Sequence, residues 1–397
     1  MFEHLNTLPQ DPILSLMKTF REDPRTDKVD LGVGVYRDEA GATPIMAAVQ
    51  AAQERLLATE TTKAYIGPAG AEGFNRLIAQ LLLGGSHPAL QDGRVNVVQT
   101  PGGCGALRMA AEFLKLCKAD TTVWVSNPTW ANHIPLLGGA GLNICEYPYL
   151  DQATLSVDFD AMMACLEQAS AGDVVLLHGC CHNPSGADLD ADQWAAITAL
   201  VERKGLLPFI DIAYQGLGEG LDQDALGVRL MAERLPEVIV ASSCSKNFGL
   251  YRERTGALML ISANAQQGQA ATSQLLSAIR SHYSMPPSHG AAVVETILDT
   301  PELMQQWQHE LDTMCSRILD LRAGLSQALA PAGDFSFIER QRGMFSFLGI
   351  SPQQVQILRD EFGIYMLDSS RINIAGLSTA TLPRVAEALK EVVGRTE

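Results

Sequence analysis

Short apolar runs alternate with helical patterns through the middle of the chain. Most of the runs are bounded by Gly, Pro, Asn or Ser, as short buried strands usually are. Between them, residues 106–117 and 192–204 place apolar side chains at helical spacing. This alternation predicts βα units, and therefore an α/β fold with a mostly parallel sheet and helices on both faces. The strand-like runs are Val95–Gln99, Thr122–Ser126, Asp173–His178, Leu206–Asp211, Glu237–Ala241 and Gly256–Ile261.

The pattern changes in the last quarter of the chain. Residues 301–330 predict one long helix. Two strand-like pieces follow at 344–350 and 365–376, and a final helix begins near Leu382. The segment up to about residue 45 has several turn residues and no strong period, and we expect it to wrap onto this smaller α+β part. The predicted domains are a large one at 46–300 and a small one formed by 1–45 and 301–397.

Length, composition and charge narrow the class of protein. A chain of 397 residues is too long for one ordinary core, which supports two domains. Its 47% hydrophobic and 19% charged residues are typical of a soluble globular protein. We find no long apolar run and no basic segment before an apolar block at the N-terminus, so we expect no membrane span, no signal peptide and a cytoplasmic location. The net charge of −16 argues against nucleic acid or an anionic membrane as a partner.

The cysteines predict no metal site. The chain has 8 of them, without a paired CxxC spacing, and Cys180 and Cys181 are adjacent. In a chain without a secretory signal, this usage favours free buried thiols in a reducing cytosol.

Glycine, aromatic and ionisable residues follow five of the predicted strands at the point where each strand ends. Because the carboxyl ends of parallel strands meet at one edge of a sheet, ligands gather there. The sequence therefore predicts one ligand site built from these strand ends. The segments are TPGGCGALR (100–108), NPTWANH (127–133), GCCHNPSG (179–186), DIAYQG (211–216) and SSCSK (242–246).

The glycine-rich segment that opens a helix suits a phosphate group. Backbone N–H groups at Gly103 and Cys104, together with the positive end of the helix, would face a dianion. Arg254 offers a bidentate guanidinium and Ser243 a hydroxyl. A tight turn, a salt bridge and a helix cap are the plainer alternatives. The segment matches neither GxGxxG nor a P-loop, which disfavours dinucleotides and nucleoside triphosphates.

Lys246 is the unusual residue, because it stands at the tip of a buried strand. A lysine that is partly desolvated and close to other cations keeps its amine neutral, and a neutral amine forms Schiff bases with carbonyls. The alternative is a lysine that extends its side chain to solvent from a strand end.

Four more residues complete a set of contacts to one ligand. Asp211 could pair with a pyridinium N–H, which keeps the ring protonated and electron-withdrawing. Tyr214 and Asn183 could hydrogen-bond a phenolate oxygen, and Trp130 offers a face for stacking. Taken alone, each of these residues is more simply explained by a structural role. Together with Lys246 and the phosphate contacts, they match every polar edge of pyridoxal phosphate.

These motifs resemble the fold-type I aspartate and aromatic amino acid aminotransferases of subgroup Iα. The resemblance implies the pyridoxal-phosphate-dependent transferase fold, with a mostly parallel seven-stranded sheet flanked by helices, a smaller α+β domain, and a homodimer with shared active sites. It spans nearly the whole chain in the family's order. Further matches are LGVGVYRDE (31–39), TTKAYIGPAG (61–70), LLHGCCHNPSG (176–186), SSCSKNFGLYRERTG (242–256), YSMPPSHGA (283–291), GMFSF (343–347) and SRINIAGL (370–377).

The resemblance implies a role for each candidate residue. Lys246 matches the Schiff-base lysine that also moves the α-proton, and Asp211 matches the pyridinium partner, with His133 and His178 behind it. Tyr214 and Asn183 match the phenolate-oxygen ligands, and Trp130 matches the stacking indole. The matches to phosphate ligands are Gly103, Cys104, Ser243, Arg254 and, from the other subunit, Tyr65.

The substrate contacts follow in the same way. Arg371 matches the arginine that binds the substrate α-carboxylate, and the backbone of Gly34 approaches the same group. Asn183 and Trp130 also line the substrate position. Arg280 matches the cross-subunit arginine that binds the distal carboxylate of aspartate or glutamate. Without the family pattern, Arg371 and Arg280 would be ordinary exposed arginines.

The expected reaction moves the amino group of tyrosine, phenylalanine or aspartate to 2-oxoglutarate by a ping-pong mechanism, through the pyridoxal and pyridoxamine forms of the cofactor. A strict aspartate aminotransferase is the alternative. Cys104, Ala64 and Met285 depart from the aspartate pattern, and Met285 could line an apolar pocket for a ring. The stretch LGVGVYRDE and Thr43 fit the aspartate type better.

Two other classes stay open from the residues alone. A lyase using the same cofactor would release pyruvate and ammonia without a keto-acid acceptor, although Arg280 and Arg371 favour transamination. A binding protein on a catalytically dead scaffold would show no Schiff-base absorption band, although every catalytic position is filled.

Overall fold

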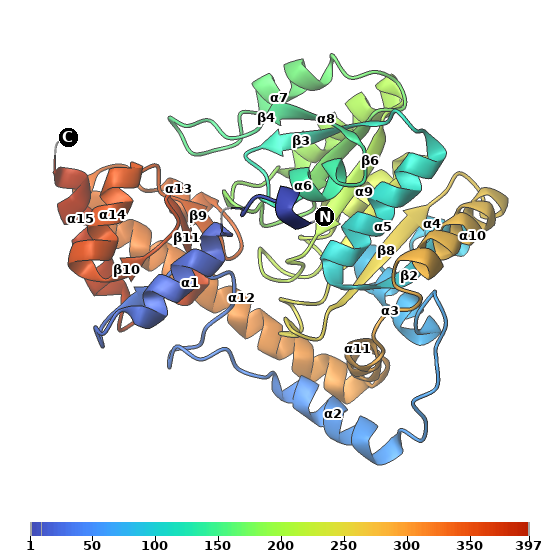
Figure 1. Ribbon diagram of the computed structural model, residues 1–397, viewed down its shortest axis with the longest axis horizontal. Helices are drawn as coiled ribbons and strands as arrows, with labels where there is room; N and C mark the ends of the chain where they lie inside the picture. The colour runs from blue at the N-terminus through green and yellow to red at the C-terminus, as the bar shows by residue number, and fades with distance from the viewer. Residues whose placement is uncertain (1, 9, 396–397) are drawn as a thin grey trace. The chain divides into compact units, whose positions relative to one another are not determined.

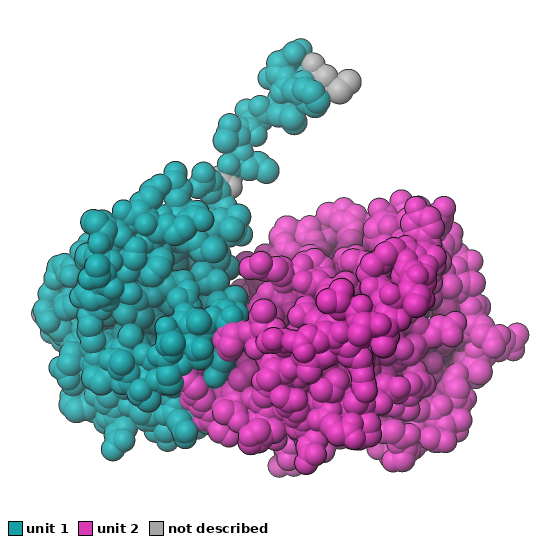
Figure 2. Space-filling view, turned by 90° about the horizontal axis from the view of Figure 1, so that it is seen from below, with its two compact units in different colours: residues 1–43, 318–340, 344–397 teal, residues 44–317, 341–343 magenta. Residues whose placement is uncertain are grey.

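The computed structural model describes residues 2–8 and 10–395. It divides into two compact units, which are coloured separately in Figure 2. Unit 1 consists of residues 1–43, 318–340 and 344–397, and unit 2 of residues 44–317 and 341–343. The domain boundaries expected from the sequence stay a prediction. Within the described residues, no helix has both the length and the apolar character that crossing a membrane requires.

A seven-stranded sheet forms the centre of unit 2 (Figure 1). Its order is β2-β8-β7-β6-β5-β3-β4, and every neighbouring pair is parallel except the two that involve β8. The predicted mostly parallel sheet is therefore confirmed. The strands are β2 (Val95–Pro101), β3 (Thr122–Asn127), β4 (Asn143–Pro148), β5 (Val174–His178), β6 (Leu207–Ile212), β7 (Val238–Ser243) and β8 (Thr255–Ile261).

Helices cover both faces of the sheet, which buries the strands on both sides. One face packs against α5, α6 and α10, and the other against α3 and α9, with α8 lying on α9. The predicted helix at 192–204 is confirmed as α8, while α5 begins four residues before the predicted start at 106. The helices that begin in this unit are α2 (Ala47–Thr59), α3 (Glu72–Leu83), α4 (Pro88–Gln91), α5 (Gly102–Cys117), α6 (His133–Gly138), α7 (Phe159–Leu166), α8 (Ala191–Lys204), α9 (Leu226–Arg234), α10 (Ala265–His282), α11 (His289–Asp299) and α12 (Pro301–Leu329).

Local sequence signals set the two ends of α8. Asp190 caps α8 in a capping box with Gln193, and Gly205 ends the helix with φ of 64°. The predicted long helix at 301–330 is confirmed as α12, whose residues belong to both units.

The chain reverses its winding direction between β3 and β5. The helix after β3, α6, lies with α5 on one face of the sheet, and the helix after β5, α8, lies with α9 on the other. Because the loops after these adjacent strands lead to opposite faces, they leave a crevice beyond the carboxyl ends of the strands. The sequence places NPTWANH and GCCHNPSG in these two loops.

The direction of β8 brings a distant residue to the same edge. Since β8 runs antiparallel to β2 and β7, its first two residues pair with the last residues of those strands: Thr255 faces Pro101, and Gly256 faces Ser243. Arg254, just before β8, therefore lies at the edge where the parallel strands end.

Unit 1 is a smaller α+β arrangement. β1 pairs with β10 in parallel, and β9 pairs with β11 antiparallel. The N-terminal segment contains an amphipathic helix, α1, so the expectation of no strong period there was wrong; Asp11 caps α1 and Pro12 is its first residue. The elements are α1 (Pro12–Glu22), β1 (Val29–Asp30), α13 (Phe337–Arg340), β9 (Phe345–Phe347), α14 (Pro352–Phe362), β10 (Ile364–Tyr365), β11 (Arg371–Asn373) and α15 (Leu382–Gly394).

Candidate functional site

Backbone and small side chains form a cup where β2 ends and α5 begins. Gly102 has φ of 70°, and a Cβ there would lie 2.5 Å from the Nη2 atom of Arg254. A Cβ at Gly103 would lie 3.0 Å from the Cβ of Ser243. α5 is 16 residues long and its N-cap makes no side-chain hydrogen bond, so its first N–H groups, which belong to the residues of this cup, have no capping side chain. The cup thus brings together Gly103, Ser243 and Arg254, as the sequence predicted.

Arg254 is exposed and has a left-handed backbone, with φ of 52°. Its Nη1 atom donates to the carbonyl of Tyr251 at 2.8 Å and to the hydroxyl of Ser245 at 3.4 Å. The Ser243 hydroxyl accepts from the backbone N–H of Ser245 at 3.2 Å. A guanidinium fixed in this way places a positive charge at the mouth of the cup.

Lys246 lies in the turn after β7, and its Nζ atom is 4.9 Å from the centre of the Tyr214 ring. Burial of the amine and the nearby Arg254 guanidinium lower the pKa of Lys246 to about 8, although the Asp211 carboxylate acts in the opposite direction. At pH 7 about a tenth of the amine is therefore uncharged, far more than in a lysine of ordinary pKa, and the uncharged amine is the nucleophilic form.

Asp211, at the end of β6, accepts a hydrogen bond from the fully buried His133. The distance between His133 Nε2 and Asp211 Oδ2 is 3.0 Å. Burial acts to raise the pKa of Asp211, but the His133 hydrogen bond and the nearby positive charge of Lys246 outweigh it, so the pKa lies below its ordinary value. The carboxylate therefore stays ionised beside a buried imidazole.

Thr129 connects His133 to His178. Its hydroxyl lies 2.7 Å from His133 Nδ1 and 3.3 Å from His178 Nε2. Burial and the neighbouring His133 lower the pKa of His178 to about 3, so this imidazole is neutral. On its other side, His178 Nδ1 accepts from the backbone N–H of Asn183 at 3.4 Å. The chain of contacts from Asp211 reaches the loop that carries Asn183.

Trp130 and Cys104 lie beside this network. The Trp130 ring is half-buried and meets the His133 ring edge-on, with centroids 5.3 Å apart. Cys104 Sγ accepts from Asn132 Nδ2 at 3.6 Å, and burial raises the pKa of this thiol. Asn183 and Tyr214 are both buried.

Sequence reasoning missed the larger aromatic cluster behind the site. Tyr149 stacks on His182 at 4.1 Å, and the His182 ring lies 4.1 Å from His178. Ser126 and Ser185 hold the two nitrogens of His182 at 3.0 and 2.8 Å. The repeated His in HGCCH was the available signal. Thr129 and Tyr149 gave none, because their contacts with His178 and His182 join positions that are distant in the sequence.

Tyr65 and Arg280 are exposed in the single chain. The Tyr65 side chain is 92% accessible, and Arg280 donates to the hydroxyl of Ser284 at the end of α10. No described contact joins either residue to the cup or to Lys246. Met285 is half-buried, and its N–H donates to the carbonyl of Tyr283 at 2.7 Å.

Arg371 and Gly34 lie close together in unit 1. The Arg371 side chain is 5% exposed, donates to the carbonyl of Gly32 at 2.7 Å and packs 4.3 Å from the centre of the Phe345 ring. A Cβ at Gly34 would lie 2.9 Å from the same ring. The glycine therefore leaves room for the ring that supports the guanidinium.

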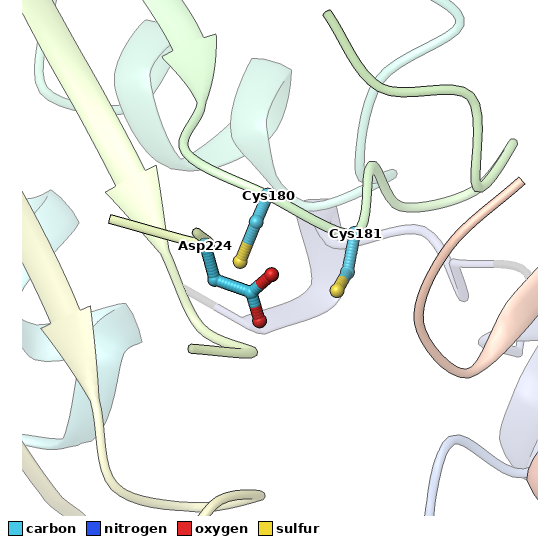
Figure 3. Close-up of side chains that lie close together, drawn as sticks. All are labelled: Cys180, Cys181 and Asp224. Carbon is cyan, nitrogen blue, oxygen red and sulfur yellow. The ribbon is translucent and has the colours of Figure 1, made fainter. Parts of the chain in front are cut away.

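Cys180, Cys181 and Asp224 form a buried cluster, the one group of possible metal ligands found among the described residues (Figure 3). Asp224 accepts from the backbone N–H groups of Gly216, Gly218 and Glu219 at 2.8 to 2.9 Å. The Cys181 thiol acts to lower the pKa of Cys180, but burial and nearby carboxylates raise it to about 12.

The cluster has a structural explanation. Both thiols stay protonated at neutral pH, and both oxygens of Asp224 already accept backbone hydrogen bonds. Its effect is to join the loop after Tyr214 to the loop that carries Asn183. The predicted free thiols are confirmed for all 8 cysteines, although only Cys180, Cys181, Cys244 and Cys315 are buried.

Comparison with known proteins identifies the family. The family model described as "Aminotransferase class I and II" matches residues 26–389. The chain belongs to the class I and II aminotransferases. It is 50% identical to the aromatic-amino-acid aminotransferase of Pseudomonas aeruginosa, with 98% of each chain covered, and 47% identical to the aspartate aminotransferase of Escherichia coli, with 99% of this chain and 100% of that one covered.

A solved aminotransferase structure superposes on nearly the whole of this chain. The aromatic-amino-acid aminotransferase of Burkholderia pseudomallei, covalently bound to pyridoxal phosphate, superposes with a TM-score of 0.97 at 43% identity and covers 99% of both chains. The predicted resemblance and the fold-type I architecture are therefore confirmed.

Proposed function

We propose that this aminotransferase binds pyridoxal phosphate at the strand ends and transfers amino groups from both aromatic amino acids and aspartate to 2-oxoglutarate. The observation that carries the proposal is the position of Lys246. A lysine with a pKa of about 8 stands above the Tyr214 ring, near an ionised Asp211 and beside an arginine-lined cup.

The described residues fit the cofactor. The cup lacks Cβ atoms at Gly102 and Gly103, and a Cβ at Gly256 would lie 2.5 Å from the backbone of Gly102, so a phosphate can approach bare backbone. Gly103, Cys104, Ser243 and Arg254 hold the phosphate, with Tyr65 of the partner subunit. Asp211 would pair with the ring nitrogen, Tyr214 and Asn183 would hydrogen-bond the ring oxygen, and Trp130 would offer its face to the ring.

The catalytic residues divide the tasks among them. When bound, pyridoxal phosphate supplies an aldehyde carbon that links amines and a ring that withdraws electrons. Lys246 would offer its neutral amine to that carbon and would move the proton of the substrate α-carbon. Asp211, fixed by His133, keeps its negative charge against the ring nitrogen, and Tyr214 positions Lys246 through its ring.

The substrate is held by its carboxylates. Arg371, supported by Phe345, binds the α-carboxylate in a bidentate contact, and the backbone of Gly34 approaches it. Arg280, contributed by the other subunit of a homodimer, binds the distal carboxylate of aspartate and of 2-oxoglutarate. The cytoplasmic location expected from the sequence stays a prediction.

Met285 favours dual over strict aspartate specificity. A half-buried thioether in the loop after Arg280 can line an apolar pocket for a ring, whereas an amide there would hydrogen-bond. The experiment is to measure kcat/KM for tyrosine, phenylalanine and aspartate, each with 2-oxoglutarate, on the purified holoenzyme. Comparable values support the dual function. A preference for aspartate of about a thousandfold, about 4 kcal/mol of transition-state discrimination, identifies a strict aspartate aminotransferase.

A further inference from the structure

The first half of α12 packs against the two loops that carry Lys246 and Tyr214 (Figure 1). Trp307, Leu311 and Cys315 are spaced four residues apart, so they lie on one face of the helix. Their exposures are 0%, 0% and 6%. This buried face, all of it within unit 2, is outside the set of residues that the proposed function uses.

Trp307 contacts the two residues that follow Lys246. Its indole N–H donates to the carbonyl of Asn247 at 2.8 Å. Its ring stacks on Phe248, with centroids 4.4 Å apart and an interplanar angle of 6°. One side chain therefore fixes both a backbone carbonyl and the next side chain of the lysine turn.

The same turn is held from its other side. Gly249, with φ of 64°, donates its N–H to the carbonyl of Lys246 at 3.1 Å, and a Cβ there would lie 3.9 Å from Met46. Glu310, one turn after Trp307 on α12, accepts from the first N–H groups of α2, Ala47 at 2.6 Å and Ala48 at 3.0 Å. The turn thus lies between α12 and the start of α2, which α12 itself caps.

Leu311 and Cys315 extend the contact to the loop after Tyr214. A Cβ at Gly216 would lie 2.4 Å from Leu311 Cδ2, so the helix and this loop are in close contact. Cys315 Sγ donates to the carbonyl of Gly218 at 3.5 Å. One helix face therefore sets the position of the lysine and of the ring beneath it.

We propose that Trp307 is a positioning residue for Lys246, which fixes the turn after the lysine and thereby the direction and the dry surroundings of its amine. The effect on turnover rests on the proposed function, whereas the effect on the amine does not. Loss of the indole N–H would leave the Asn247 carbonyl without its donor, loosen the turn and admit water to the amine.

The test compares Trp307→Phe, which keeps an aromatic ring against Phe248 but removes the N–H donor, with Trp194→Phe. Trp194 is a matched control because it is 4% exposed on α8 and packs against Gly227 of α9. The first measurement is acetylation of Lys246 by acetic anhydride between pH 6 and pH 11 in cofactor-free protein, quantified by peptide mass spectrometry. The second is kcat and KM of the holoenzyme.

In the parent protein the acetylation midpoint should lie near pH 8. In Trp307→Phe it should move toward the ordinary lysine value by about one pH unit, and kcat should fall about tenfold or more with a nearly constant KM. Trp194→Phe should leave midpoint and kcat unchanged even where its melting temperature falls. If Trp307→Phe matches the parent in midpoint and kcat, the indole only fills the core and the proposal is overturned.

A second variant covers a folding failure of the first. Phe248→Leu keeps the indole donor and removes the stacking, and it should raise the midpoint in the same direction by a smaller amount; an unchanged midpoint again overturns the proposal. If the parent shows the low midpoint but binds no pyridoxal phosphate, the proposed function fails, while the comparison of midpoints still decides the role of Trp307.

Discussion

At the scale of single residues, the site depends on how the surroundings change one amine. Lys246 has a pKa near 8 because burial and Arg254 favour the neutral form more strongly than Asp211 favours the charged one. The same Asp211 keeps its own charge because His133 donates to it. The lowered pKa of Lys246 therefore suits a nucleophile, and the lowered pKa of Asp211 suits a carboxylate that pairs with a ring nitrogen.

A pH dependence follows from the lowered pKa of Lys246. Below pH 8 the neutral fraction of the amine, and with it the rate of reaction with an aldehyde, should fall about tenfold per pH unit; above pH 8 the rate should level off. The measurement is the rate of absorbance change when cofactor-free protein meets pyridoxal, which lacks the titrating phosphate. A rate that keeps rising to pH 10 would show that the amine behaves as an ordinary lysine.

Met285 provides the residue-scale test of specificity. Replacing it with Asn should raise the ratio of kcat/KM for aspartate to that for phenylalanine about tenfold or more, because the amide adds hydrogen bonds near Arg280 and makes the pocket less favourable for a ring. Met304→Asn is the control, since Met304 is 37% exposed on α12. An unchanged ratio in Met285→Asn would show that this position does not set specificity.

At the scale of elements, the antiparallel strand β8 is what completes the cup. It places Gly256 against Ser243 and puts Arg254 at the edge where parallel strands end. The sequence predicted β8 as a strand and Arg254 as a phosphate ligand. The apolar run TGALMLI, however, does not indicate whether this strand is parallel or antiparallel to its neighbours. The geometry that joins the two predictions comes from pairing between distant strands, which an apolar run does not specify.

Replacing Gly256 with Ala tests this element. The new Cβ would lie 2.5 Å from Gly102 C, 2.6 Å from Ser242 O and 2.7 Å from Gly103 N, all backbone atoms that cannot rotate away. We expect a loss of about 1 to 3 kcal/mol of stability and a weaker affinity for pyridoxal phosphate, because the start of α5 must shift. Thermal unfolding and fluorescence titration measure the two effects.

Gly138→Ala is the matched control, since a Cβ at Gly138 would meet nothing within 4 Å. It should leave both the melting temperature and the cofactor affinity close to the parent values. If Gly256→Ala behaves like this control, the contact between β8 and the start of α5 is not tight in solution.

Sequence reasoning missed the strand β4 for a physical reason. β4 (NICEYP) is an edge strand with one buried side chain, Tyr147, so it carries neither an apolar run nor an alternating pattern. Five of the predicted strands, β3, β5, β6, β7 and β8, are central in the sheet. β2 lies at the other edge, but its run Val95–Gln99 contains the apolar residues that β4 lacks. Likewise, Lys246, Asp211 and Asn183 could be predicted because they stand close to strand ends, whereas Thr129 contacts His178 and Trp307 contacts Asn247 only once the chain has folded.

At the scale of the whole molecule, unit 2 leaves apolar side chains uncovered between residues 45 and 66. Ile45 is 68% exposed, Leu57 87%, Tyr65 92% and Ile66 37%. Exposed apolar groups gathered in one segment of the sequence are typical of a surface that another protein covers. Tyr65 belongs to this segment, and in the proposed homodimer it reaches the phosphate of the other subunit.

Shared active sites can be tested with two inactive chains. Lys246→Ala lacks the lysine but keeps Arg280, and Arg280→Asp lacks the distal-carboxylate arginine but keeps Lys246. In a hybrid dimer, the Lys246 of the second chain meets the Arg280 of the first, which restores one complete site. Random mixing in equal amounts should therefore restore about a quarter of the parent aspartate activity, since half of the dimers are hybrids with one working site each.

Each variant unfolded and refolded alone is the control, and differently tagged chains report hybrid formation. If hybrid dimers form but no aspartate activity returns, Arg280 acts within its own chain or does not contact the substrate at all.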